Sequence, residues 1–135
     1  MQTILRSSLV IVGLAFLTGC NNEPERFDLS GTVTYKGTPV PAGNIIFSPD
    51  DSKGNRGPST SATILNGKYS TPSGQGVFGG PYVARIFGSD GIPAPIPGDP
   101  NKTLNPSGKQ LFPDIQVPID LPKKPGSQDF SLPLK

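Results

Sequence analysis

Residues 27–36 read FDLSGTVTYK, a stretch in which apolar and polar side chains alternate. Successive side chains of a β-strand point to opposite faces of a sheet, so this alternation predicts a strand with one buried face. A segment rich in glycine and proline follows at 37–43 and predicts a turn. The residues expected on the buried face of the first strand are Phe27, Leu29, Gly31, Val33 and Tyr35.

The same alternation recurs between segments that favour turns. The Asn66-Gly67 pair predicts a two-residue hairpin turn, because both positions tolerate a positive φ. Pro118 and Pro122 place one late strand at a sheet edge, since proline cannot donate to a central ladder. Seven short strands without a helix predict an all-β fold, a seven-stranded antiparallel sandwich. The six further strands are expected at 44–48, 59–65, 68–71, 82–87, 115–121 and 130–134.

The composition limits the classes of function. The 135 residues suffice for one domain, and 17 glycines with 17 prolines favour a turn-dense β protein over long helices. The chain has no histidine and one cysteine, so familiar Ser–His–Asp and histidine–zinc mechanisms are unavailable to it. The formal net charge is +2 and the longest basic run is Lys123-Lys124, which argues against nucleic-acid binding. We therefore expect no enzyme activity, no cofactor and no metal.

Residues 1–19 have the pattern of an export signal. A short basic start containing Arg6 precedes nine apolar residues at 9–17, which are too few to span a membrane as a helix. The run ends in Leu17-Thr18-Gly19-Cys20, which resembles the lipobox of bacterial lipoproteins. This resemblance implies cleavage between Gly19 and Cys20 and lipidation of the Cys20 thiol by diacylglycerol. The alternatives are an ordinary signal peptide followed by a chance cysteine, and a buried core cysteine.

The implied anchor predicts a location. Two or more acyl chains hold a protein stably on a bilayer. We expect the protein to be lipid-anchored at the cell membrane or outer membrane and exposed to the periplasm or the cell surface. Residues 20–26 are polar and contain Pro24, so they are expected to form a lipidated tether, with the β-domain at 27–134.

The order of several loose motifs resembles a known domain family. Gly31-Thr32-Val33, followed by Pro39-Val40 and Ala42-Gly43, resembles the opening of carboxypeptidase regulatory-like domains. Asn66-Gly67-Lys68-Tyr69 is similar to their central hairpin, and GPYVARI at 80–86 to their next strand. The resemblance implies a transthyretin-like, or prealbumin-like (Ig-like), β-sandwich without an implied activity. With its lipobox, the chain resembles the small lipoproteins of planctomycete-type bacteria.

Two loops contain residues that occur in ligand sites. Residues 74–79 fit G-x-G-x-x-G, but a strand rather than a helix is expected after them, so a dinucleotide site is rejected. An oxygen-rich loop at 50–55 could hold Ca²⁺, although Lys53 lies within it and its spacing differs from that of known calcium loops. A solvated loop is the preferred interpretation. The oxygen-bearing residues are Asp50, Asp51, Ser52 and Asn55.

The segment 88–110 is the candidate interaction loop. It contains five prolines and is longer than compact domains usually tolerate without a reason. Its proline-rich part favours polyproline II, an extended shape that docks into aromatic grooves. A disordered surface loop is the alternative, and Leu111-Phe112-Pro113 is expected to pack the end of the loop onto the sandwich. The candidate interaction residues are Ile92, Pro93, Pro95, Ile96 and Pro97.

These features lead to two hypotheses about function. The leading hypothesis is a non-catalytic envelope lipoprotein whose β-sandwich is an interaction or structural module. The alternative is a small-ligand (glycan) binding module that uses Tyr82 or the proline-rich segment. The sequence favours the first, because glycan sites usually present aromatic side chains and this chain has no tryptophan. The expected partners are the membrane, through the lipid anchor, and an envelope protein or a glycan.

Overall fold

The computed structural model describes residues 23–133, which form an all-β domain. Within this range there are eleven strands and one 3-10 turn, η1 (Asp51–Lys53), and no helix is long and apolar enough to cross a membrane. The longer strands are β1 (Leu29–Tyr35), β3 (Ala42–Pro49), β4 (Thr60–Leu65), β5 (Lys68–Ser70), β6 (Gly80–Ser89), β9 (Ile115–Leu121) and β11 (Phe130–Leu132). The two-residue strands are β2 (Thr38–Pro39), β7 (Ala94–Pro95), β8 (Leu104–Asn105) and β10 (Gly126–Ser127).

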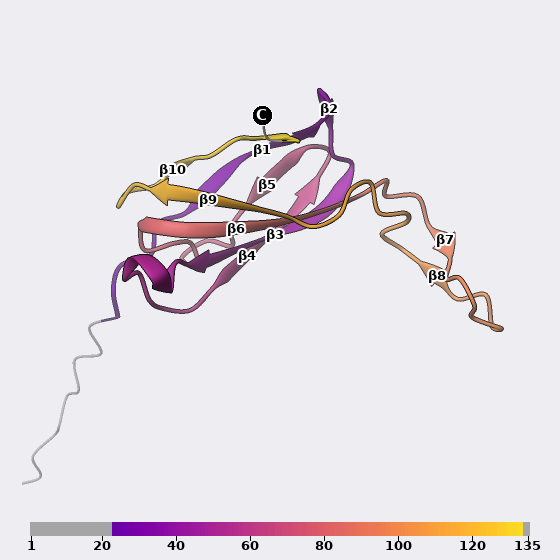
Figure 1. Cartoon of the computed structure of the whole chain (residues 1–135), viewed down its shortest axis with the longest axis horizontal. Coiled ribbons are helices and arrows are strands. Elements are labelled where there is room, and N and C mark those ends of the chain that lie inside the picture. The colour runs from indigo at the N-terminus through magenta and orange to yellow at the C-terminus, as the bar shows by residue number, and fades with distance from the viewer. Residues whose placement is uncertain (1–22, 134–135) are drawn as a thin grey trace, which may run out of the picture.

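Nine of these strands belong to one curled sheet (Figure 1). Its hydrogen-bonded order is β10-β1-β5-β4-β3-β6-β9, and β2 and β11 also pair with β1. The pairings are antiparallel except for two short parallel ones, of β1 with β10 and of β1 with β11. The fully antiparallel arrangement expected from the sequence is therefore wrong at β10 and β11. After β9 the chain continues into β10 and β11, which lie beside β1 and run in the same direction as β1.

Each of the seven predicted segments overlaps one of the longer strands, but the boundaries differ. β6 is longer than the predicted 82–87, because Gly80 pairs with Leu121 and Ser89 pairs with Ala42. The predicted turn at 37–43 contains β2 and the first residues of β3. Asn66 and Gly67 adopt φ values of 50° and 75° and form the predicted turn between β4 and β5. β9 lies at the end of the sheet order, so its edge position is confirmed.

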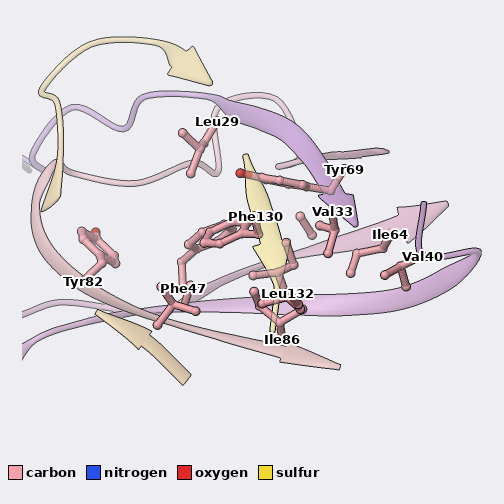
Figure 2. Close-up of a cluster of buried hydrophobic side chains, with 14 of the residues drawn as sticks. Leu29, Val33, Val40, Phe47, Ile64, Tyr69, Tyr82, Ile86, Phe130 and Leu132 are labelled. Atoms are coloured by element: carbon pink, nitrogen blue, oxygen red, sulfur yellow. The ribbon is translucent and has the colours of Figure 1, made fainter. Parts of the chain in front are cut away.

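The curl of the sheet encloses one core (Figure 2). Inward side chains of β3, β4, β6 and β9 pack against those of β1, β5 and β11. Phe47 on β3 is fully buried, and the centre of its ring lies 5.8 Å from that of Tyr69 and 6.4 Å from that of Phe130. Leu29 and Val33 are buried as the alternation in the first strand predicts.

Gly31 is an inward position of β1 that a side chain could not occupy. A Cβ there would overlap the carbonyl group of Gln128 and touch the ring of Tyr69. The free space lets the Tyr69 hydroxyl donate a hydrogen bond of 2.6 Å to the carbonyl oxygen of Gln128. Burial, with a smaller contribution from the charge of Asp129, raises the pKa of Tyr69 above its usual value of 10.0. The phenol therefore stays protonated and ties β5 to the returning segment.

We expect Phe47→Ala to lower the free energy of unfolding by about 3–5 kcal/mol, because it leaves a cavity where β3 meets β5 and β11. Urea unfolding followed by circular dichroism measures this change. Ile46→Ala is the matched control, since Ile46 directly precedes Phe47 on the same strand and is only half-buried. The control should cost about 1 kcal/mol. Equal losses in the two variants would contradict the packing described here.

Candidate functional site

The segment 88–110 forms a projecting β-hairpin. β7 pairs with β8 in a two-stranded sheet separate from the main one. The amide of Asp90 donates to the carbonyl oxygen of Lys109 at 2.9 Å, and the amide of Leu111 donates to that of Gly88 at 3.0 Å, so the pairing continues back to β6. We call residues 90–109 the arm. A paired arm thus occurs where the sequence suggested polyproline II or a disordered loop.

Two carboxylates hold the arm in this conformation. Oδ1 of Asp90 accepts hydrogen bonds of 2.9 Å from the amides of Ile92 and Lys109. The carboxylate of Asp99 accepts hydrogen bonds from the amides of Asn101 at 2.9 Å and Thr103 at 3.0 Å. Hydrogen bonding to Thr103, and then to Asn101, holds the pKa of Asp99 below its usual value of 3.8. These bonds satisfy amides that strand pairing leaves free, which is why a proline-rich segment can form a hairpin here.

The tip of the arm is a β-turn that uses a Pro-Gly pair. The amide of Asp99 donates to the carbonyl oxygen of Ile96 at 3.2 Å, which closes a four-residue turn. Pro97 and Gly98 occupy its central positions, and Gly98 has a φ of 79°. This arrangement is typical of a type II turn, in which proline presets the first φ and glycine supplies the positive one.

The arm and the start of the described chain lie at opposite ends of the long axis of the molecule (Figure 1). The chain enters beside η1. There, the guanidinium of Arg26 lies 5.0 Å from the ring centre of Phe78, and Phe27 exchanges backbone hydrogen bonds of 2.7 and 2.9 Å with Val77. These contacts fix the point at which any tether would leave the domain. The arm therefore points away from that attachment point.

Exposed apolar side chains gather on the arm and beside it. On the arm, Ile92 is 66% exposed, Leu104 55% and Ile96 44%. Single exposed apolar residues are common. Three of them on one projecting element make the arm a candidate contact surface. Among the described residues, the large apolar side chains that are exposed are Leu65, Ile92, Ile96, Leu104 and Leu111.

Prolines remove the free hydrogen-bond donors from the edge of the arm. The amide of Ile96 points to the opposite strand, where it donates to the carbonyl oxygen of Thr103 at 2.9 Å. Because amides alternate in direction along an antiparallel strand, the nitrogens at 93 and 95 point outward. Both positions are proline, which has no N–H to offer. Pro106 has the corresponding outward place on the second strand, so Leu104 carries the remaining outward amide of the paired segments 93–96 and 103–106. The arm therefore resists pairing with a further strand.

The sequence-predicted site residues have different outcomes. The five predicted interaction residues lie together in and around β7 and at the tip of the arm: Pro95 in β7, Ile92 and Pro93 before it, and Ile96 and Pro97 in the tip turn. Gly19 and Cys20 lie outside the described residues. The prediction that Tyr82 contacts a glycan is wrong, because Tyr82 is only 1% exposed. Its hydroxyl accepts a hydrogen bond of 3.0 Å from the Phe78 amide. Phe112 is buried with its ring 4.8 Å from that of Tyr35, as expected for a residue that packs the loop end onto the domain.

The two motif-like loops have structural roles. Oδ1 of Asp50 accepts hydrogen bonds from the hydroxyl and the amide of Ser52 and so caps η1, and the Ser52 hydroxyl is the main cause that lowers the pKa of Asp50. The side-chain amide of Asn55 donates to the carbonyl oxygen of Pro81 at 2.7 Å. In the part of the chain that is described, no cluster of His, Cys, Asp or Glu has the arrangement of a metal site. The glycine-rich segment 74–79 leads directly into β6, as the rejection of a dinucleotide site requires.

Sequence reasoning missed a groove at the base of the arm. It has a volume of about 590 Å³ and lies between the main sheet and residues 105–110. Its lining comes from four segments that are distant in the sequence, so no local pattern could have revealed it. We call it the arm groove, and its main side chains are Asn44, Thr63, Leu65, Phe87, Ser107 and Gln110.

Comparisons with known proteins do not identify the chain. No family model, curated protein or solved structure matches it. The resemblances to lipoproteins and to carboxypeptidase regulatory-like domains therefore remain predictions.

We expect the double variant Pro93→Ala, Pro95→Ala to self-associate, because it restores two outward amides on the edge of the arm. Sedimentation velocity over a concentration series measures the effect. Pro100→Ala is the matched control, since Pro100 lies in the tip beyond the paired strands. The account of the edge is contradicted if the double variant associates no more than the wild type and the control.

Proposed function

We propose that the protein is a lipid-anchored lipoprotein of the bacterial cell envelope whose β-domain is a non-catalytic interaction module. Residues 1–19 act as its signal peptide, and Cys20 carries the lipid after cleavage behind Gly19. The observation that carries the proposal is the position of the arm at the end of the domain opposite the attachment point. An anchor at that point displays the exposed apolar side chains of the arm away from the bilayer.

The distance between lipid and domain supports this orientation. Arg26 is the first residue that contacts the domain, and the six residue steps from Cys20 to Arg26 span at most about 22 Å when extended. The domain is therefore held close to the membrane by the end that carries η1. Arg26 and Phe27 already contact the domain, so little free chain remains to let it turn over.

We also propose that the curled sheet is a prealbumin-like sandwich. β4, β3, β6 and β9 would form one layer, and β5, β1 and β11 the other. This division uses the seven longer strands and leaves the two-residue strands as additions. The contacts of Phe47 with Tyr69 and Phe130 join the two layers and support the division.

Photo-crosslinking in living bacteria tests the proposal, with a benzophenone amino acid at Ile92 on the arm or at Lys53 in η1 of the full chain. We expect a crosslinked envelope protein from position 92 and much less from position 53, because only the arm faces away from the membrane. In the same cells, Cys20→Ser should prevent incorporation of labelled fatty acid and release the protein from the membrane fraction.

The two parts of this experiment fail separately. Fatty-acid label retained by Cys20→Ser would overturn the anchor. Equal crosslinking from both positions, or none from position 92, would overturn the role of the arm while leaving the anchor intact.

A further inference from the structure

The arm groove brings polar and aromatic side chains together on the outer face of the main sheet. Ile45 is buried, so the side chain of its neighbour Asn44 points to the outer face of the sheet. The cross-strand partners of Asn44 are Thr63 on β4 and Phe87 on β6. These three side chains therefore lie side by side across three strands. Gln110, which pairs with Ser89 at the end of β6, also lines the arm groove at the base of the arm. The volume of about 590 Å³ is typical of small-molecule sites.

The lining of the arm groove is uncharged. Among the described residues that line it, none is Asp, Glu, Lys or Arg, although the chain has 22 such residues (12 basic and 10 acidic). Within the described part of the chain, the side chains of Asn44, Thr63 and Gln110 form no hydrogen bond. They offer amide and hydroxyl groups that can both donate and accept. Leu65 and Phe87 supply apolar surface beside them.

The ring of Phe87 is held in place from outside the arm groove. The guanidinium of Arg85 lies 5.2 Å from the centre of the ring. Arg85 is itself fixed by Asp114, with Nη2 2.6 Å and Nε 2.7 Å from Oδ2 of the carboxylate. Arg85 is thus a positioning residue that orients an apolar platform, while its charge is neutralised by its partner.

This chemistry excludes several classes of ligand. A hydrocarbon would leave the amide and hydroxyl groups without partners, which is costly on burial. An anion or a cation would find no opposite charge in the lining. An extended peptide that adds to a sheet would need a row of free backbone donors, and prolines leave the paired strands of the arm with one outward amide, that of Leu104.

We propose that the arm groove binds an uncharged oligosaccharide. Sugar hydroxyls both donate and accept hydrogen bonds, as do the side chains of Asn44, Thr63 and Gln110. The C–H faces of a sugar ring match the apolar surfaces of Phe87 and Leu65. The proposal gives glycan binding a location that does not involve Tyr82. The inference rests on the proposed orientation, in which this end of the domain faces away from the membrane. It does not require that the arm bind a protein.

Titration of the full-length chain in detergent micelles tests the proposal. The probes are three neutral tetrasaccharides, chitotetraose, cellotetraose and maltotetraose, and one charged counterpart, tetragalacturonate. Amide shifts in ¹⁵N NMR spectra report the site and the affinity. We expect at least one neutral probe to shift the amides of Thr63, Phe87 and Gln110, and tetragalacturonate to bind more weakly.

Matched variants separate the arm groove from the rest of the sheet. Gln110→Ala and Thr63→Val each remove one hydrogen-bonding group from an exposed position and should weaken binding about three- to tenfold. Gln116→Ala, an exposed glutamine on β9 outside the arm groove, should leave the affinity unchanged. The inference is overturned if no neutral probe binds, if Gln110→Ala binds as well as Gln116→Ala, or if the charged probe binds best. None of these outcomes affects the crosslinking from the arm or the lipidation of Cys20.

Discussion

The contact of Phe47 with Tyr69 and Phe130 is the interaction on which the rest of the structure depends. β11 pairs with β1 over three residues, and so short a pairing is weak without packing behind it. The ring of Phe130 reaches across the core to Phe47 and Tyr69, which lie on β3 and β5. Loss of this contact would open the curl of the sheet and expose the apolar faces on both sides of it.

β6 connects the arm to this core and fixes its position relative to the core. β6 is the longest strand, and it pairs with β3 along one side and with β9 along the other. The arm begins where β6 ends, and the pairing of Ser89 with Gln110 carries the ladder into it. A strand fixed on both sides therefore transmits the orientation of the core to the arm and to the arm groove. This continuity is why an attachment point near η1 determines which way the arm faces.

The longer strands could be predicted because alternation in Leu29–Tyr35 and its counterparts reports burial directly. The short parallel pairings of β10 and β11 with β1 could not be predicted, because two or three residues are too few to show an alternation of apolar and polar side chains. The pairing of the arm depends on Asp90 and Asp99, whose carboxylates accept hydrogen bonds from backbone amides. A pattern of apolar residues does not reveal such bonds, so the sequence did not predict the hairpin. The suggestion of Tyr82 as a glycan contact ignored a signal that was present, because its alternation with Ala84 and Ile86 places it on the inward face.

The proposed orientation of a lipid-anchored domain is the central claim, and fluorescence quenching by lipids tests it most directly. The lipidated chain would be reconstituted in vesicles whose lipids carry nitroxide quenchers, with a fluorophore attached through Glu25→Cys near the attachment point or through Asn101→Cys at the tip of the arm. Strong quenching at position 25 together with negligible quenching at position 101 is the result that we expect. Equal quenching at the two positions would show that the arm lies on the bilayer and would contradict the account.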